Sequence, residues 1–402
     1  MVKIEKIPKG YRVTEAGILP VDWQVKRLNE VATELTERAG QDIYETVSIS
    51  AGIGFVNQAE KFGKELSGKQ YEKYIVLHKG DFSYNKGNSK TFPQGCIYRL
   101  NDRESAAVPN IFESFRIKKQ DADYYEQLFL SGFLNRQLYS RINRGVRDDG
   151  LLNLTGKDFY SCTVPVPPVD EQKKIAEVLL CCDRVINLKQ QLIIELQRLK
   201  NGFLQAMFPM KGRNKPDIRF PGFSKAWEQR KAKELCSIGT GKSNTQDQVD
   251  DGKYPFYIRS DVPVRSNKYL YDCEAVITIG DGNIGKVFHY VNGKFDLHQR
   301  CYKMTDFQDI WGKYFFYYFS TRFYDRAMKM TAKATVDSVR LEMISEMDIW
   351  KPIQIDEQQK IAELFTNLDN LITLHQRELE ETKKKKRGLA KLLLTGGVRV
   401  PT

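Results

Sequence analysis

Two nearly identical phrases constrain the fold of this chain more than any other feature of its sequence. The first, DEQKKIAEVL, begins at Asp170, and the second, DEQQKIAEL, begins at Asp356. The match continues past the phrase at a constant offset of 186 residues, so that Asp183 is paired with Asp369. A chain that repeats itself at a fixed spacing builds the same local structure twice.

Each phrase opens a long helical pattern, because apolar residues follow it at the alternating steps of three and four that form a coiled-coil seam. In the first copy the predicted seam contains Ile175, Val178, Cys182, Val185, Lys189, Leu192, Leu196, Leu199 and Phe203. In the second copy it contains Ile361, Leu364, Leu368, Leu371, His375 and Leu389. A helix from Glu171 to about Met207 would be about 55 Å long. We expect the two helices to pack on each other; the alternative is that each stripe covers only its neighbouring domain.

Proline and an acidic pair mark where each helix starts. The entrances read PVPPVDEQ and KPIQIDEQ. We therefore expect Asp170 and Asp356 to be the N-caps, with the following glutamates favourable at the positive end of each helix.

A fainter repeat precedes each long helix. DWQVKRLNEVA resembles AWEQRKAKELC, which pairs Trp23 with Trp227 and Glu30 with Glu234. The distance from tryptophan to the aspartate of the phrase is 147 residues in the first half and 129 in the second. The intervening sequences read as compact mixtures of short strands and helices, and MFPMKGRNKPDIRFPGF reads as a linker. The two halves thus share their ends and differ in their contents.

Composition narrows the partners and the compartment. The chain has 402 residues, with 63 basic and 51 acidic side chains and a formal net charge of +12, which favours a polyanionic partner. No apolar run approaches the roughly 18 residues of a membrane span, and a secretory signal is missing, so we expect a soluble, cytoplasmic protein. The seven scattered cysteines then read as reduced thiols.

The sequence contains no complete motif for catalysis or for metal binding. IGTGKSN lacks the first glycine of a phosphate-binding loop, G-x-x-x-x-G-K-S, because Cys236 occupies the position four intervening residues before Gly241. The four histidines have no metal-ligand spacing, and the sequence contains neither a methyltransferase motif nor a convincing nuclease motif. We therefore expect no catalytic residue and no metal site in this chain.

The duplicated EQxxIA phrases, the tryptophan entrances and the ending KLLLTGGVRVP resemble the specificity (S) subunit of type I restriction-modification systems. The resemblance covers essentially the whole chain, although the second phrase is preceded by one proline where the first has two. It implies an α+β fold in which two globular α/β target recognition domains are separated by two long antiparallel helices, an intramolecular coiled coil with pseudo-two-fold symmetry. The expected domains are residues 1–165 and 213–351 for recognition, and residues 166–212 and 352–402 for the conserved helices.

The resemblance also implies the function and the partners. Such a subunit binds double-stranded DNA at a bipartite, asymmetric site and recruits two adenine methyltransferase subunits, to which up to two restriction subunits are added. It holds no cofactor itself: S-adenosylmethionine belongs to the methyltransferase subunit, and ATP and Mg to the restriction subunit. The alternative is a stand-alone coiled-coil DNA-binding regulator. The bases that are read and the spacer length do not follow from the sequence.

Candidate DNA contacts are basic and small polar residues in turn-rich loops, the residue types that contact phosphates and base edges. In the first half they are Tyr84, Asn85, Lys86, Asn88, Ser89, Lys90, Arg141, Arg144 and Arg147. In the second half they are Lys242, Ser243, Asn244, Arg259, Arg265, Asp281, Asn283, Lys286, Lys333, Thr335 and Arg340. The alternative for each loop is an ordinary solvated turn.

Overall fold

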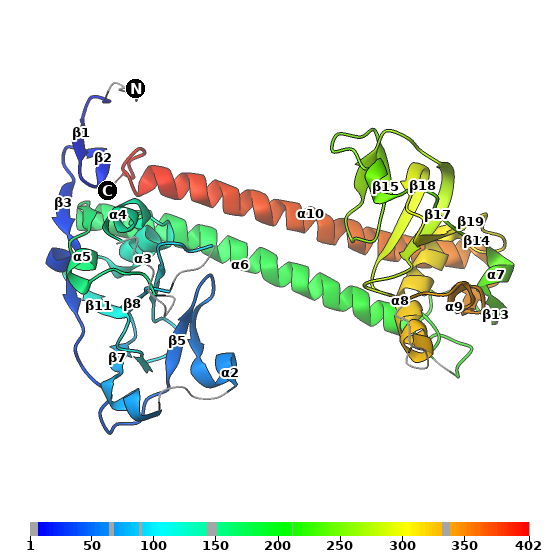
Figure 1. The fold of residues 1–402 in the computed structure, drawn as a ribbon, viewed down its shortest axis with the longest axis horizontal. Helices are drawn as coiled ribbons and strands as arrows, with labels where there is room; N and C mark the ends of the chain where they lie inside the picture. The colour runs from blue at the N-terminus through cyan, green and yellow to red at the C-terminus, as the bar shows by residue number, and fades with distance from the viewer. Residues whose placement is uncertain are drawn as a thin grey trace. The chain divides into compact units, whose positions relative to one another are not determined.

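We describe the protein from a computed structural model, in which the described residues are 7–63, 68–87, 91–142, 151–210, 212–331 and 338–401. This part of the chain forms two compact units, the first made of Met1–Leu188 and Glu378–Thr402 and the second of Lys189–Arg377. The long helices α6 (Val169–Ala206) and α10 (Ile355–Leu393) each contribute one segment to each unit (Figure 1). The four domain boundaries expected from the sequence stay predictions. Within the described residues, every helix is either too short or too polar to span a lipid bilayer.

The first unit is built on an antiparallel sheet whose described strands run in the order β4 (Ala32–Glu34), β11 (Glu113–Ile117), β8 (Phe82–Asn85) and β9 (Cys96–Arg99). Smaller antiparallel pairs are β1 (Tyr11–Thr14) with β2 (Gly17–Pro20), β3 (Gln24–Arg27) with β12 (Thr163–Val166), β5 (Val47–Ser50) with β6 (Gly54–Asn57), and β7 (Ile75–His78) with β10 (Ser105–Val108). Its shorter helices are α1 (Leu28–Val31), α2 (Gln58–Phe62), α3 (Ala122–Leu130), α4 (Asn135–Arg141) and α5 (Gly156–Tyr160).

The core of the first unit joins the sheet to both long helices. Phe82 and Phe115 stack with ring centroids 5.4 Å apart, and the same core contains Leu179 of α6 and Leu393 of α10. The beginning of α6 therefore packs with the end of α10, so the two segments run antiparallel within this unit.

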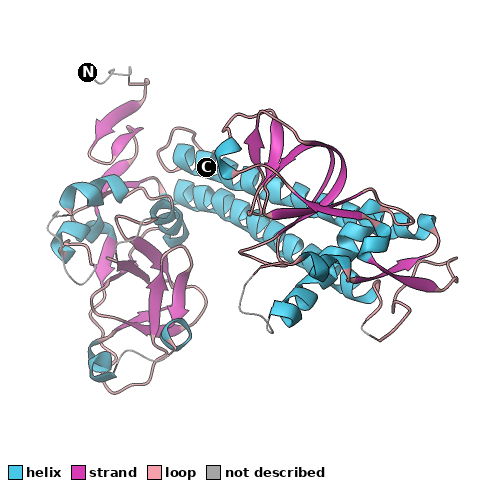
Figure 2. Ribbon diagram, turned by 45° about the vertical axis from the view of Figure 1, so that its right-hand side comes forward, coloured by secondary structure: helices cyan, strands magenta, loops and turns pink. Residues whose placement is uncertain are grey.

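The second unit has a larger sheet. Its described strands follow the order β14 (Ser237–Thr240), β19 (Cys301–Thr305), β17 (Tyr271–Ile279), β18 (Phe288–Leu297), β15 (Tyr254–Tyr257) and β16 (Val264–Ser266). A separate pair joins β13 (Trp227–Lys231) to β20 (Asp348–Pro352), and the helices besides the long ones are α7 (Ala232–Leu235), α8 (Gly312–Thr331) and α9 (Leu341–Ser345). Helix α8 packs against β17 and β18 of this sheet; Figure 2 draws helices in cyan and strands in magenta.

The segment read from the sequence as a linker is partly built into the second unit. Phe208 is fully buried and makes an edge contact with Tyr318 and a tilted contact with Phe365 of α10. The end of α6 thus packs with the beginning of α10, which is the antiparallel arrangement of the first unit repeated.

Equivalent ion pairs link the long helices in the two units. Lys386 of α10 binds Asp183 of α6 in the first unit, with Nζ 2.5 Å from Oδ1. In the second unit Lys200 of α6 binds Asp369 of α10 at the same distance. The two aspartates are 186 residues apart in the sequence, and so are the two lysines. The sequence repeat therefore extends to tertiary contacts.

The predicted coiled-coil seam is wrong at every second position. Ile186 and Ile193 are 9% and 7% exposed, whereas the predicted seam residues Val185 and Leu192 are 39% and 42% exposed. In α10, Leu371 is 43% exposed while the next residue is buried. The sequence left this choice open because α6 carries apolar residues side by side, and steps of three–four and four–three then fit equally well.

The predicted N-caps are also displaced. Helix α6 begins at Val169 and α10 at Ile355, so Asp170 and Asp356 lie inside the first helical turn. Their negative charges remain favourable there, close to the positive end of each helix.

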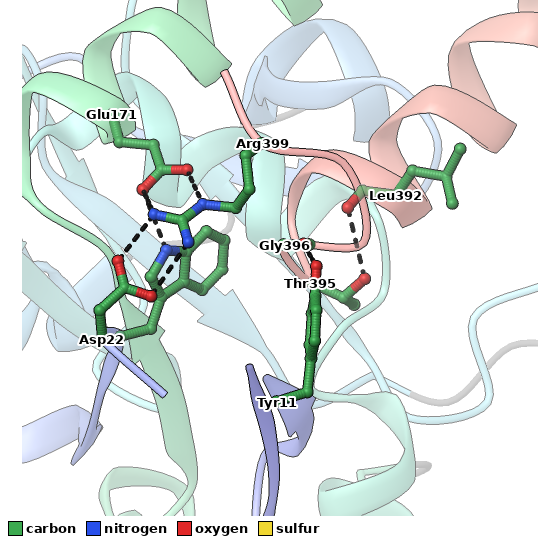
Figure 3. Close-up of polar contacts among 8 residues, drawn as sticks. Tyr11, Asp22, Glu171, Leu392, Thr395, Gly396 and Arg399 are labelled. Carbon is green, nitrogen blue, oxygen red and sulfur yellow. Dashed lines mark hydrogen bonds and ion pairs between the residues drawn. The ribbon is translucent and has the colours of Figure 1, made fainter. Parts of the chain in front are cut away.

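The glutamate of the first phrase is the centre of a buried clamp. Glu171 is 1% exposed, and its Oε2 accepts a hydrogen bond of 3.0 Å from Nε1 of Trp23. Arg399, beyond the end of α10, donates to both carboxylate oxygens at 2.6 and 2.9 Å. The other edge of the guanidinium reaches Asp22, as Figure 3 shows.

The second unit repeats this clamp. Glu357 is fully buried and accepts hydrogen bonds from Nε1 of Trp227 at 3.4 Å and from Arg219 at 2.6 and 2.8 Å. Arg219 follows α6 just as Arg399 follows α10. In each unit, one carboxylate therefore joins the tryptophan near the start of the unit's repeat, the beginning of one long helix and the segment after the other long helix.

The glutamine of each phrase forms a second repeated tie. Gln172 donates to the carbonyl of Pro167 and accepts from the backbone N–H of Asp121, the N-cap of α3. Gln358 donates to the carbonyl of Pro352 and accepts from the N–H of Trp311, just before α8. The repeated glutamine thus links the end of a strand to the start of a helix in each unit.

The observed seam predicts which apolar residues support the helices. Replacing Ile186 and Ile372 with alanine should cost about 2–4 kcal/mol each, because buried side chains are lost. The matched variants Val185→Ala and Leu371→Ala should change stability by under about 0.5 kcal/mol, because these side chains are largely exposed. Urea unfolding followed by circular dichroism measures the difference, and the reverse ranking would refute the observed register.

The clamp predicts that Arg399→Ala leaves the Glu171 carboxylate buried with one fewer partner. We expect a loss of roughly 1–3 kcal/mol in local stability, below the cost of a fully buried pair because the arginine is partly exposed. Hydrogen exchange of a peptide covering residues 168–180 reports this loss. The control Asp22→Asn removes a half-exposed partner and should cost less than about 1 kcal/mol; equal effects would contradict the central role of Glu171.

Candidate nucleic-acid interface

Three candidate residues of the first unit, Tyr84, Asn85 and Lys86, lie at the end of β8. Tyr84 is fully buried, stacks on Phe159 at 4.7 Å and donates its hydroxyl to the carbonyl of Gln94. Burial raises the pKa of this phenol, which therefore stays protonated. The prediction that Tyr84 contacts DNA is wrong, because a strand residue that points into the core has no surface to offer.

The neighbours of Tyr84 shape the turn that follows. The Asn85 side chain accepts from the N–H of Gly87 and donates to the carbonyl of Ile49. Lys86 forms a largely buried ion pair with Glu113, with Nζ 2.7 Å from Oε1. These contacts fix the base of the loop, and DNA contact by these two residues stays a prediction.

Arg141 is held at the end of α4. Its Nε donates to the hydroxyl of Ser161 at 3.2 Å, and its Nη1 donates to the carbonyl of Gln137. Other candidates lie outside the described residues, namely Asn88, Ser89, Lys90, Arg144 and Arg147 in the first unit and Lys333 and Thr335 in the second.

The second unit brings several candidates together at one end of its large sheet. Asp281 follows β17, Arg259 follows β15, and Arg300 lies in the turn between β18 and β19. Nη1 of Arg300 donates to Asp281 at 2.8 Å, and Nη1 of Arg259 donates to both oxygens of the same carboxylate at 3.2 and 3.3 Å. We call these three residues the arginine fork.

The arginine fork is half-open to solvent and carries one net positive charge. The side chains of Arg300 and Arg259 are 62% and 46% exposed, whereas that of Asp281 is 21% exposed. Burial would raise the pKa of Asp281, but the hydrogen bonds from Arg300 and Arg259 outweigh it and the pKa is lowered. The carboxylate is therefore ionised at neutral pH and holds both guanidinium groups.

Two glycines allow the segments of this site to approach one another. A Cβ on Gly280 would lie 2.6 Å from the carbonyl oxygen of Arg300, and one on Gly241 would lie 2.2 Å from that of Leu297. Side chains at these positions would push the chains apart. Gly241, which the sequence offered as part of a failed phosphate loop, is a close-packing residue.

The loop after β14 divides its residues between the core and the surface. Ser243 is 1% exposed and donates to the buried Asp296 at 2.6 Å, so the prediction that it contacts DNA is wrong. Lys242 and Asn244 on either side are exposed, and Asn244 accepts a hydrogen bond from Gln299. The buried serine anchors the loop that carries these two polar side chains.

Sequence reasoning missed Gln299 and Arg300. Thr240, Gly280, Asp281, Gln299, Arg300, Tyr302, Ser338 and Val339 line a shallow cavity of about 260 Å³ beside the arginine fork. Only the letters HQR between two strand patterns hinted at this turn, and nothing local indicated that it meets Asp281.

The remaining candidates lie elsewhere on the second unit. Arg265 sits on β16 and donates to the carbonyls of Gly252 and Lys253, while Lys286 lies over the ring of Tyr324. Asn283 and Arg340 are exposed, the latter 3.8 Å from a glutamate carboxylate. Their contact with DNA stays a prediction.

Comparison with known proteins gives one consistent family. The chain matches the type I restriction modification DNA specificity domain over residues 20–198 and 224–384. It is 27% identical over 287 residues to the type I restriction enzyme MjaVIII specificity subunit of Methanocaldococcus jannaschii, covering 62% of this chain and 65% of that protein. It is 22% identical over 439 aligned positions to the putative type I restriction enzyme MjaX specificity subunit of the same organism, covering 98% of each chain.

The fold has a counterpart among solved structures. The S subunit of a type I restriction-modification system from M. genitalium matches 97% of this chain and 98% of its own, with a TM-score of 0.63 and 13% identity. At this identity the likeness concerns the fold. The family assignment rests on the two matched segments, which span most of the sequence. The chain therefore belongs to the specificity subunits of type I restriction-modification systems.

Proposed function

We propose that this protein is the non-catalytic, DNA-reading subunit of a type I restriction-modification complex, and that it recognises a bipartite, asymmetric site while recruiting adenine methyltransferase subunits. The observation that carries this proposal is a repeated clamp and helix pairing around two unlike sheets. The clamp and the helix pairing occur in both units, so we assign them a task that both units share, which is support and partner binding. The parts that differ serve discrimination.

Recognition of double-stranded DNA is supported by charge and by the arginine fork. The chain has a formal net charge of +12, which favours the phosphate backbone. Exposed arginine, lysine and amide side chains gather where the loops of the second sheet meet, and these are the residue types that read base edges.

An asymmetric site is supported by the difference between the sheets. The order β4-β11-β8-β9 in the first unit has no counterpart in the order β14-β19-β17-β18-β15-β16 of the second, within the described strands. Loops that leave such different sheets present different side chains, so the two half-sites should differ in sequence.

Recruitment of two methyltransferase subunits is supported by apolar residues that the helix seam leaves exposed. Val185 and Leu188 are 39% and 64% exposed on α6, and Leu371 and Leu374 are 43% and 49% exposed on α10. The offset of 186 residues relates Val185 to Leu371 and Leu188 to Leu374. Equivalent apolar surfaces on two equivalent segments suit two copies of one partner.

The chemistry belongs to the partners in this proposal. The methyltransferase subunits supply S-adenosylmethionine, restriction subunits supply the ATP- and Mg-dependent step, and the assembly works in the cytoplasm, where its DNA is. A stand-alone regulator that dimerises through these helices is disfavoured, because in each unit the segments of α6 and α10 already cover each other's apolar seam.

The proposal predicts a methylation signature in the host genome. Deleting the gene should abolish adenine methylation at one split motif and leave other methylated motifs unchanged, because sequence choice resides in this subunit. Long-read sequencing of native DNA measures this, and re-expression from a plasmid should restore the motif. Survival of every split motif in the deletion strain would contradict the proposal.

The two apolar surfaces predict the stoichiometry. Leu188→Asp and Leu374→Asp should each remove one methyltransferase subunit from the purified complex, and the double variant should remove both, because a charge in an apolar interface is costly. Native mass spectrometry counts the subunits. Glu195→Ala on the exposed face of α6 is the control and should keep both; full assembly of the double variant would place the docking surface elsewhere.

A further inference from the structure

The arginine fork of the second unit has a geometry that goes beyond general affinity for DNA. Asp281 receives hydrogen bonds from Arg300 at 2.8 Å and from Arg259 at 3.2 and 3.3 Å. These bonds use Nη1 of each arginine, and both side chains are half-exposed or more. The guanidinium planes are thus oriented by the protein before any ligand arrives.

The carboxylate at the centre argues against a phosphate as the ligand. The carboxylate of Asp281, which the hydrogen bonds from the arginines keep ionised, would repel a phosphate group beside it. Phosphate contacts position a protein on DNA and carry no base information, whereas reading a base edge needs donors in a fixed orientation. A carboxylate that orients two arginines, as Asp281 does, suits the reading of a base edge.

We propose that Arg300, oriented with Arg259 by Asp281, reads a guanine in the half-site bound by the second unit, and that Asp281 is a positioning residue. Guanine presents two acceptors, O6 and N7, in the major groove, and two N–H groups of one guanidinium can donate to both. Gln299 and Asn244, joined by a hydrogen bond of 2.6 Å, lie in the adjoining turn and loop and supply amide groups for a neighbouring base.

This inference rests on the proposed function and adds a base and a residue to it. It requires that the recognised motif contain a G·C pair in one half-site, and that Arg300 govern that position alone. Removing a bidentate contact to guanine lowers discrimination against other bases by roughly tenfold or more.

The test uses the complete complex, co-expressed with its methyltransferase subunits in a host without other adenine methylation. Sequencing the methylated DNA gives the wild-type motif. With Arg300→Ala, one guanine of one half-site should become degenerate, by roughly tenfold or more in relative methylation, while the other half-site is unchanged. The unchanged half-site also shows that the variant is folded and assembled.

Further variants separate base reading from phosphate binding. Arg300→Lys keeps the charge and loses the planar pair of donors, so it should relax the same base position, whereas loss of a phosphate contact would weaken methylation at every sequence alike. Asp281→Asn should relax that position in part, because the arginines lose their anchor. Arg213→Ala removes an exposed arginine of the same unit that pairs with Asp217 and is not a candidate DNA contact, so it should leave the motif intact.

Two results would overturn the inference while leaving the proposed function standing. One is a wild-type motif without a G·C pair in either half-site. The other is an Arg300→Ala complex that methylates the unchanged motif at a uniformly lower rate with weaker dependence on salt, the signature of a backbone contact. Absence of any split motif with the wild-type complex would overturn the inference together with the proposed function.

Discussion

The buried carboxylate of the repeated phrase is the interaction on which the rest of this structure depends. Glu171 and Glu357 are both removed from solvent, and such a charge is tolerated only when strong donors surround it. Each accepts a hydrogen bond from the indole N–H of the repeated tryptophan, Trp23 or Trp227, and from a guanidinium in the segment that follows the opposite long helix. One glutamate therefore fixes three distant parts of the chain in each unit.

The clamp explains why the phrase repeats while the sheets do not. Its members come from the ends of each half, so the strands between Trp23 and the start of α6 are free to vary in number and order. The clamp and the long helices thus form a constant framework that can support different sheets. Such an arrangement lets recognition loops diverge without disturbing the helices, since the clamp residues and the loop residues do not overlap.

Local patterns predicted the elements well and the side-chain roles less well. The two long helices, the strands around residues 75–85 and 271–297 and the helix in YFFYYFSTRFYDRAMKM are all present. The seam slipped by one residue at alternate positions because Val185 and Ile186 are both apolar and only the partner helix distinguishes them. Tyr84 and Ser243 were misassigned because a polar side chain in a turn-rich stretch gives no sign of which way it points.

The sequence by itself determined that the chain is built on a duplicated helix start, that its two halves differ in content, and that its family is that of specificity subunits. The first two conclusions follow from the spacing and the types of residues along the chain, and the family follows from the resemblance of the repeated phrases, the tryptophan entrances and the ending to those of specificity subunits. Only the tertiary structure decided that the repeated glutamates bind arginines located after the opposite helices, and that Arg300 meets Asp281. Both contacts join residues far apart in the chain, and no local pattern encodes which distant group a side chain will meet.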